Sequence, residues 1–200
     1  MPLDREQIVA GALRLVDGEG LDALTLRSLA AHLGVQAPTL YWHVKNKSEL
    51  LDALADAIMD DAIGGVEQLD ADTTDPAWLL EALEQLRGAM LHRRDGARIV
   101  SGARSSLRRA DFSERAMATL VERGMDVHRA RLLVLAGERY TVGWVLEEQS
   151  PEPVGAQVDP DELQARFPVM MGAISDYFVG TGRTADDLYR DAARLILHIA

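Results

Sequence analysis

Two short helical patterns separated by a glycine, near the N-terminus, constrain the fold of this 200-residue chain more than any other feature. Thr25 can cap the first helix, LRSLAAHL at 26–33, because its hydroxyl can accept hydrogen bonds from unpaired backbone N–H groups. Gly34 then ends that helix, since glycine adopts the left-handed conformation without strain. Pro38 suits the first turn of a second helix, PTLYWHV at 38–44, where a missing N–H costs nothing. Two short helices joined by such a turn predict a helix-turn-helix.

The second helix has two different faces. At about 100° per residue, Leu40 and Val44 share the face that points inward. The opposite side collects polar and aromatic side chains, namely Gln36, Thr39, Trp42 and His43, with Tyr41 at its flank. Contacts to phosphates and base edges in a DNA major groove require a surface of this kind. An alternative is that Tyr41 and Trp42 pack against a neighbouring part of the protein.

The charge of the chain is distributed unevenly. The formal net charge is −11, which taken alone argues against a nucleic-acid partner. Residues 23–48, however, contain no Asp or Glu and carry Arg27, Lys45 and Lys47, so this window is +3 and the rest is −14. We therefore expect a small basic surface on an acidic protein, weak non-specific DNA binding and a modest dependence of binding on salt.

The composition excludes several other classes of protein. The chain has no cysteine, so it has no disulfide framework, thiolate nucleophile or cysteine-based zinc site. No stretch approaches the ~20 apolar residues of a membrane span. The N-terminal sequence MPLDREQIV lacks the pattern of a signal peptide, so we expect a cytoplasmic protein without a membrane partner. Apolar residues make up 48% of the chain, which is enough for a substantial core.

The remaining sequence repeats the helical periodicity and predicts an all-α fold. A first helix is expected at 5–18, and a long connecting helix at 48–66 that is capped by Ser48 and ends at Gly64 and Gly65. A polar connector, 67–75, leads to helical patterns at 76–92, 95–102, 106–124, 127–148, 164–180 and 184–199, with a mobile proline-containing loop at 149–163. This predicts a helix-turn-helix domain at 1–47, a connecting helix at 48–66 and a helical core at 67–200.

The run LTLRSLAAHLGVQAPTLYWHVKNKSELLDAL, residues 24–54, resembles the DNA-binding domain of the TetR (tetracycline repressor) family of transcriptional regulators. The segments LHRRDGARIVSGAR and TVGWVLEEQ resemble parts of the regulatory core of the tetracycline repressors. The resemblance implies a homodimeric repressor that binds a palindromic operator and releases it when a small-molecule inducer occupies the core. It places the DNA contacts on Thr25, Arg27, Gln36, Pro38, Thr39, Tyr41, His43 and Lys47, with Trp42 on the same outward surface. Ala37 stands where the tetracycline repressors have a base-reading glutamine, which implies a different operator sequence.

Two helical patterns carry apolar stripes that a partner subunit could cover. Leu132, Leu133 and Leu135 lie in 127–148, and Leu188, Ala192, Leu195 and Ile196 lie in 184–199. In the resembling fold, these two helices form a four-helix bundle with a symmetry mate, and a two-fold dimer is what a palindromic operator requires. The alternative is that single residues of these stripes belong to the ordinary core.

The core departs from the tetracycline repressors at the inducer position. Val100 replaces the histidine that anchors their magnesium–tetracycline chelate, and Ala82, Leu86, Gly64, Ala103 and Ser105 replace other ligand-binding residues. Without an imidazole at position 100 the metal loses a ligand. We therefore predict no metal site, no cofactor and an inducer other than magnesium–tetracycline.

A more apolar chamber with a few charges remains, and such a chamber suits a drug-like or metabolite ligand. The predicted ligand-binding residues are Leu86, Val100, Arg104, Ala116, Arg139, Tyr140, Trp144 and Glu147. For Arg104 and Glu147, a buried structural ion pair is an equally good interpretation.

An all-helical enzyme and a helical interaction module that does not bind DNA are the competing functions. The five histidines are scattered, and none shows metal-ligand spacing such as H-E-x-x-H. The chain also lacks a nucleophile elbow and a phosphate-binding loop, so we predict no catalytic residues. Loss of DNA binding on Tyr41→Ala and His43→Ala would separate a DNA-binding regulator from a module that does not bind DNA.

Overall fold

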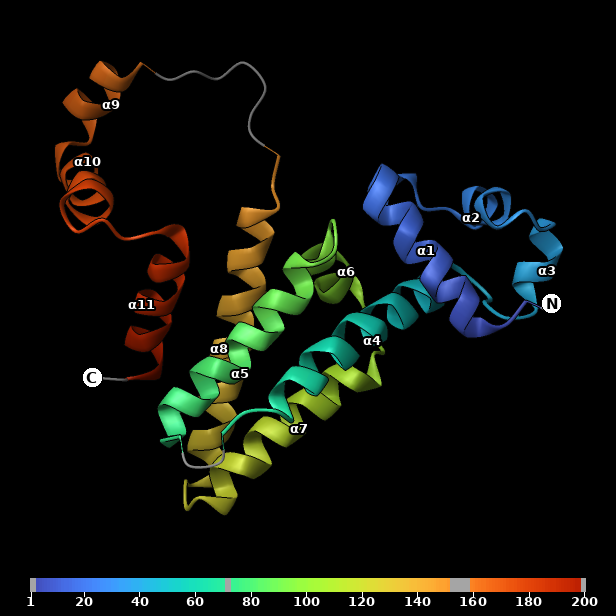
Figure 1. Ribbon diagram of the computed structural model, residues 1–200, viewed down its shortest axis with the longest axis horizontal. Coiled ribbons are helices and arrows are strands. Elements are labelled where there is room, and N and C mark those ends of the chain that lie inside the picture. Colours follow the sequence, from blue (N-terminus) through green and yellow to red (C-terminus); the bar gives the residue numbers. More distant parts are fainter. Residues whose placement is uncertain (1–2, 71–72, 152–158, 199–200) are drawn as a thin grey trace.

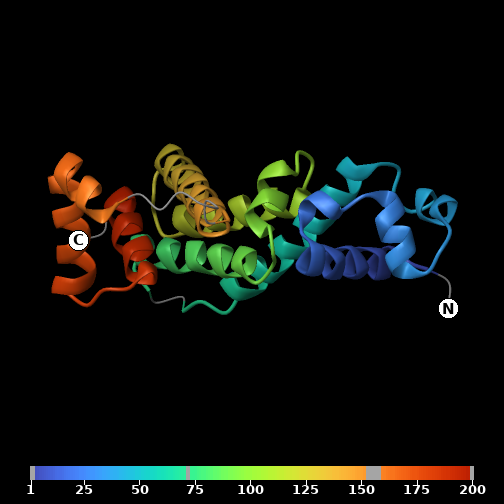
Figure 2. The same cartoon turned by 90° about the horizontal axis from the view of Figure 1, so that it is seen from above.

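The computed structural model describes residues 3–70, 73–151 and 159–198, and every regular element in these ranges is helical. Figure 1 shows a small N-terminal unit, a long helix that leaves it, and a bundle to which that helix belongs. The view from above in Figure 2 shows the same succession along the longest axis, with the C-terminal helices at the end opposite the N-terminal unit. The predicted all-α fold is confirmed. Within the described ranges, no helix combines the length and hydropathy needed to cross a bilayer.

The N-terminal unit contains α1 (Arg5–Glu19), a short 3-10 turn η1 (Leu21–Ala23), α2 (Leu26–Leu33) and α3 (Ala37–Tyr41). Ile8, Leu29 and Leu40 are completely buried and form its centre. Burial of side chains of this size contributes roughly 1.5–3 kcal/mol each, which is how three short helices can form one stable unit. The predicted three-helix arrangement is confirmed.

The connecting helix, α4, covers Lys47–Val66. Asn46 caps it in place of the predicted Ser48, because its side-chain oxygen accepts the backbone N–H of Glu49 at 2.9 Å. The helix also continues through Gly64 and Gly65. Glycine weakens a helix interior without ending it when tertiary packing supplies the stability, as burial of Ile63 and Val66 does here.

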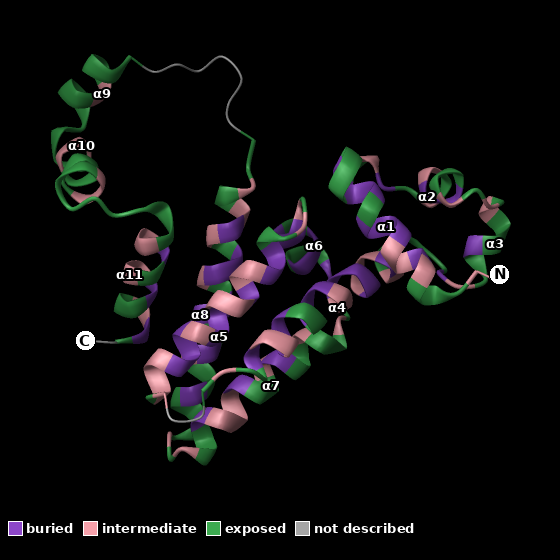
Figure 3. Cartoon of the chain, in the orientation of Figure 1, coloured by how far each residue is buried: buried purple, intermediate pink, exposed green. Residues whose placement is uncertain are grey.

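The bundle continues with α5 (Asp75–Leu91), α6 (Gly96–Gly102), α7 (Leu107–Glu122) and α8 (Val127–Glu148). In Figure 3 buried residues recur along α4, α5 and α8, between intermediate and exposed ones. Leu54, Ile58, Leu79, Leu83 and Phe112 are among the largest of these side chains, each exposed by 2% or less. The bundle and the N-terminal unit share one continuous apolar core.

The C-terminal part differs from the prediction. The expected loop at 149–163 lies partly outside the described residues, at 152–158, but its last residues form α9 (Pro160–Arg166). Asp159 accepts the backbone N–H of Asp161 at 2.9 Å, so a cap followed by proline starts a helix here.

The single helix predicted at 164–180 is interrupted at Phe167. Pro168 has no N–H and disfavours a helical conformation in the residue before it, and Phe167 accordingly has φ −130° and ψ 52°. The chain continues as α10 (Pro168–Ser175), a π-helical turn η2 (Asp176–Gly180) and α11 (Ala185–Leu197).

Candidate DNA-binding surface and regulatory core

The turn between α2 and α3 has the predicted geometry. Thr25 caps α2 by accepting the backbone N–H of Ser28 at 3.0 Å. Gly34 has φ 67° and ψ 28°, the left-handed conformation that a side chain would strain. Val35 N–H then donates to the carbonyl of Ala30 at 3.0 Å, which closes the end of α2. These local bonds determine the angle at which α3 leaves the turn.

Leu40 and Val44 anchor α3 against the unit, with exposed fractions of 0% and 1%. The helix itself is shorter than predicted, because it ends at Tyr41 and Trp42 is its C-cap. His43 N–H bonds the carbonyl of Leu40 at 2.9 Å, a tighter turn than an α-helix makes. His43 therefore lies in the turn after the recognition helix, not on it.

The outward side of α3 is open to solvent. Trp42 is 88% exposed, so the alternative that it packs against another described part of the protein is wrong, and Tyr41 is 55% exposed, so a large part of it is open to solvent. The other predicted DNA-binding residues are all at the surface: Thr25, Arg27, Gln36, Pro38, Thr39 and Lys47 are exposed, and Ala37 and His43 are partly exposed.

The basic residues of this surface are available to a partner. Arg27, Lys45 and Lys47 are exposed, and none of them forms an ion pair with another described residue. The arginines that form described ion pairs lie outside the N-terminal unit, except Arg5, which pairs with Glu49. The three cations can therefore meet phosphates without first breaking an internal pair.

Helix α4 is tied to the bundle through the connection between α6 and α7. The carboxylate of Asp52 accepts the backbone N–H groups of Arg104 and Ser105 at 2.9 and 3.1 Å. One turn later, Asp56 accepts the Ser106 hydroxyl at 2.7 Å. These bonds link the end of α6 to the helix that carries the N-terminal unit.

A second connection joins α1 and η1 to the segment between α5 and α6 and to the first turn of α6. Asp17 pairs with the Arg93 guanidinium at 3.0 Å, and Asp22 pairs with that of Arg98 at 2.7 Å. Asp95 accepts the backbone N–H of Leu21 at 2.8 Å and also pairs with Arg98. We call these five side chains, Asp17, Asp22, Arg93, Asp95 and Arg98, the interdomain latch.

The contacts of the interdomain latch lower the pKa values of two of its acids, Asp22 and Asp95. The hydrogen bond and charge of Arg98 hold the pKa of Asp22 below its ordinary value. Burial works to raise the pKa of Asp95, but the Leu21 N–H and Arg98 outweigh it and lower that pKa. The contacts of the latch that join α1 and η1 to the string RRDGAR link residues more than seventy positions apart, so helical periodicity does not predict them; the charged string itself is the local signal that could have indicated them.

The predicted ligand-binding residues have different surroundings in the structure. Leu86, Val100 and Ala116 are 1–2% exposed and belong to the packed apolar core. Tyr140 and Trp144 lie against Tyr189 of α11, with ring centroids 5.3 and 5.7 Å from the Tyr189 ring. The Tyr140 hydroxyl donates to the Tyr189 carbonyl at 2.9 Å, and this bond orients the aromatic cluster.

Arg104, Arg139 and Glu147 are exposed, and the described ion pairs do not include one between Arg104 and Glu147. The interpretation as a buried structural ion pair is therefore wrong. Arg104 instead meets α4 through its backbone, as described above, which leaves its side chain directed to solvent.

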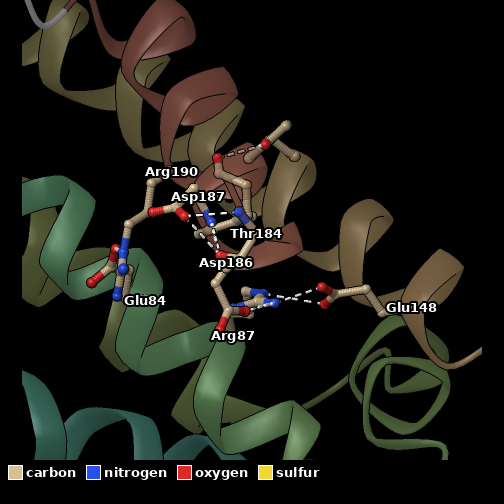
Figure 4. A network of polar contacts seen from close by, with 9 residues as sticks. Glu84, Arg87, Glu148, Thr184, Asp186, Asp187 and Arg190 are labelled. Carbon is tan, nitrogen blue, oxygen red and sulfur yellow. Dashed lines mark hydrogen bonds and ion pairs between the residues drawn. The ribbon is translucent and has the colours of Figure 1, made fainter. Parts of the chain in front are cut away.

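Helix α11 is held to the bundle by charged contacts (Figure 4). Arg87 of α5 bonds the carboxylates of Glu148 and Asp186, at 2.5 and 2.7 Å, and lies over the Tyr189 ring. Burial works to lower the pKa of Arg87, but these two carboxylates raise it overall. Arg190 of α11 pairs with Glu84 at 2.5 Å. These contacts place α11 beside α5 and α8.

Comparisons with known proteins agree with this arrangement. Residues 8–54 match the family model of bacterial regulatory proteins of the tetR family, and residues 74–198 match the tetracyclin repressor-like C-terminal domain. The class A tetracycline repressor of Escherichia coli is 34% identical over 184 residues, which cover 92% of this chain and 84% of that protein.

Solved structures give the same result. A variant of TetR from Acinetobacter baumannii AYE in complex with minocycline is 32% identical, with a TM-score of 0.76, and covers 98% of this chain and 92% of its own. BioQ bound to its double-stranded DNA operator is 29% identical, with a TM-score of 0.65, covering 84% and 94%. The relatives are transcriptional regulators, not enzymes. From its two helical units and these matches, the chain belongs to the TetR family of bacterial transcriptional regulators.

Proposed function

We propose that this regulator is a ligand-responsive repressor that binds a palindromic operator as a homodimer and leaves it when a small molecule occupies the core. The observation that carries this proposal is the exposed surface of α3 together with Arg27, Lys45 and Lys47, which have no ion pair among the described residues, in a chain that is otherwise strongly acidic. The acidic body is repelled by DNA, so this surface is the favourable side for approach. We propose residues 1–47 as the DNA-binding domain, 48–66 as the connecting helix and 67–200 as the core.

Thr39, Tyr41 and His43 are proposed to meet base edges in the major groove, and Thr25, Arg27 and Lys47 to meet phosphates. Gln36, Ala37, Pro38 and Trp42 complete the contact surface. Ala37 has no side chain that can read a base by hydrogen bonds, which supports an operator different from that of the tetracycline repressors.

The homodimer is supported by apolar side chains that this chain leaves uncovered. Leu132 of α8 is 65% exposed, and Leu195 of α11 is 78% exposed. No residue of α10 is buried, although the helix is mostly apolar. A second copy would cover these faces, as two-fold dimers do. Leu195→Glu should leave the fold intact and lower the mass measured by analytical ultracentrifugation from dimer to monomer; an unchanged dimer would contradict this interface.

The ligand is proposed to act through linkage. It weakens operator binding only if it binds the non-binding conformation more tightly. The bonds from Asp52 and Asp56 to the α6–α7 connection, together with the interdomain latch, supply the contacts by which the core could shift α4. A shift changes the separation of the two recognition helices, which must match half-sites about 34 Å apart.

Magnesium–tetracycline is not the proposed inducer. Val100 and Ala82 offer no metal ligand or hydrogen bond, and both are buried in the apolar core. Isothermal titration with tetracycline and magnesium should therefore detect no tight, metal-dependent binding. Such binding would overturn this part of the proposal.

The operator proposal is tested on the DNA upstream of the gene for this chain. A mobility-shift titration should show a specific complex, and nuclease footprinting should show two protected half-sites about one helical turn apart. His43→Ala should weaken the complex, whereas His128→Ala, an exposed histidine on α8, is the matched control and should not. Equal binding by both variants, or protection of a single site, would refute the proposal.

A further inference from the structure

Glu138 of α8 is a carboxylic acid buried inside the regulatory core. It is 5% exposed, and it was not among the residues that the sequence pointed to. One carboxylate oxygen accepts the Ser113 hydroxyl of α7 at 2.5 Å. The other oxygen has no hydrogen bond within the described residues, and none of their fully buried side-chain oxygens lacks a partner, so it faces an opening.

That opening is a groove between α7 and α8 with a volume of about 160 Å3, lined by Ser113, Met117, Arg131, Val134, Leu135 and Glu138. Three of these side chains are apolar and Glu138 is the acid among them. None of the six belongs to the set that the sequence analysis predicted for the ligand. An apolar wall with one convergent charged group is typical of a small-molecule site.

The charge of Glu138 is not neutralised by an ion pair in the described structure. Arg109 and Arg139 are near enough to lower its pKa, but burial outweighs them and raises it above the ordinary value. A buried carboxylate without a directly bonded cation is destabilising, because its hydration is lost and incompletely replaced. A ligand that brings a cation to the free oxygen recovers this loss.

We propose that the α7–α8 groove binds an organic amine with an apolar body. The ammonium group donates hydrogen bonds to Glu138, and the adjoining carbon atoms pack on Met117, Val134 and Leu135. The groove is smaller than the ~300–1,000 Å3 of sites that enclose a whole drug-sized ligand. It therefore holds one ring or short chain next to the amine. Binding of an amine in this groove does not depend on the proposed function. Only the further step, that such amines are the inducers, rests on it.

Benzylamine is a suitable probe, with benzyl alcohol and benzoate as neutral and anionic counterparts of the same size. The full-length protein labelled with 13C at its methionine methyl groups reports binding through the resonance of Met117. We expect benzylamine to shift this resonance and to bind about tenfold or more tightly than either counterpart, as a charge-assisted hydrogen bond requires. No binding of benzylamine, or equal affinity for benzyl alcohol, would overturn the proposal.

Glu138→Gln keeps the size of the side chain and an oxygen for Ser113, and it should remove the preference for the amine. A variant that keeps the preference would overturn the assignment of Glu138.

Arg131→Gln removes a cation from the rim and should strengthen benzylamine binding, because it removes a like charge. Arg129→Gln, a change at another exposed arginine of the same helix, should have no effect. Unchanged or weaker binding in Arg131→Gln would contradict the proposed position of the ammonium group.

Operator binding measured in the same samples reports separately on the proposed function. If amines bind in a Glu138-dependent way but operator affinity does not fall, the binding site is supported. The same result would refute the proposal that amines are the inducers.

Discussion

Two neighbouring residues of α3 allow DNA recognition to be separated from stability. Tyr41 is 55% exposed, whereas Leu40 is completely buried. Tyr41→Ala should change the free energy of unfolding by no more than about 0.5 kcal/mol, as surface substitutions do. Leu40→Ala creates a cavity and should cost about 2–5 kcal/mol.

Tyr41→Ala should have a large effect on operator affinity, although its effect on stability is small. A lost base contact costs about 1–3 kcal/mol in each half-site, so Tyr41→Ala should cost a dimer about 2–6 kcal/mol. The lower bound corresponds to about 30-fold weaker binding. Leu40→Ala should reduce operator binding only as far as it unfolds the domain.

Fluorescence anisotropy of a labelled operator measures the affinity, and urea unfolding followed by circular dichroism measures the stability. Leu107→Ala is the control, because Leu107 is 75% exposed and lies on α7, away from the DNA-binding surface. It should change neither quantity. Operator affinity within threefold of wild type for Tyr41→Ala, or a destabilisation equal to that of Leu40→Ala, would refute the reasoning.

Three further predictions concern charge and packing. Burial raises the pKa of Glu138 above 4.5, so the ionised form destabilises the folded state. Glu138→Gln should therefore raise the Tm at neutral pH. The difference in Tm between the variant and the wild type should shrink as the pH falls through the pKa of Glu138 in the folded state. Tyr189→Phe removes the 2.8 Å bond between its hydroxyl and Thr141 and should cost about 1 kcal/mol in urea unfolding, because Thr141 keeps its bond to Gly137. With three unpaired cations per subunit, the slope of log K against log salt for the operator should be about −5, and a slope implying ten or more neutralised phosphates would contradict the proposed surface.

Local patterns were sufficient to predict the candidate DNA-binding surface. The Thr25 cap, the left-handed Gly34 and the inward Leu40 and Val44 depend on residues within a few positions of one another, so short-range chemistry determines them. Local patterns predict less well where two signals compete at one residue. Pro168 both starts one helix and ends the preceding one, which the periodicity at 164–180 did not separate.

The regulatory core could not be predicted in the same detail. Tyr140 and Trp144 share helix α8 with Glu138, but periodicity alone does not say which neighbouring helix each one meets. The structure places the two aromatic residues against α11 and Glu138 against Ser113 of α7.

The sequence by itself determined that the chain is helical, that its first part forms a helix-turn-helix, and that its cations gather in one short window of an acidic chain. Only the tertiary structure decided which charges are paired. Asp22 and Arg98 are separated by 76 positions yet lie 2.7 Å apart, whereas Arg104 and Glu147 form no such pair. The reason is physical: helix formation follows from neighbours along the chain, but the burial and pairing of a side chain depend on how whole helices pack. The burial of Glu138 is also decided by tertiary structure, because the groove that it lines is formed by α7 and α8 together.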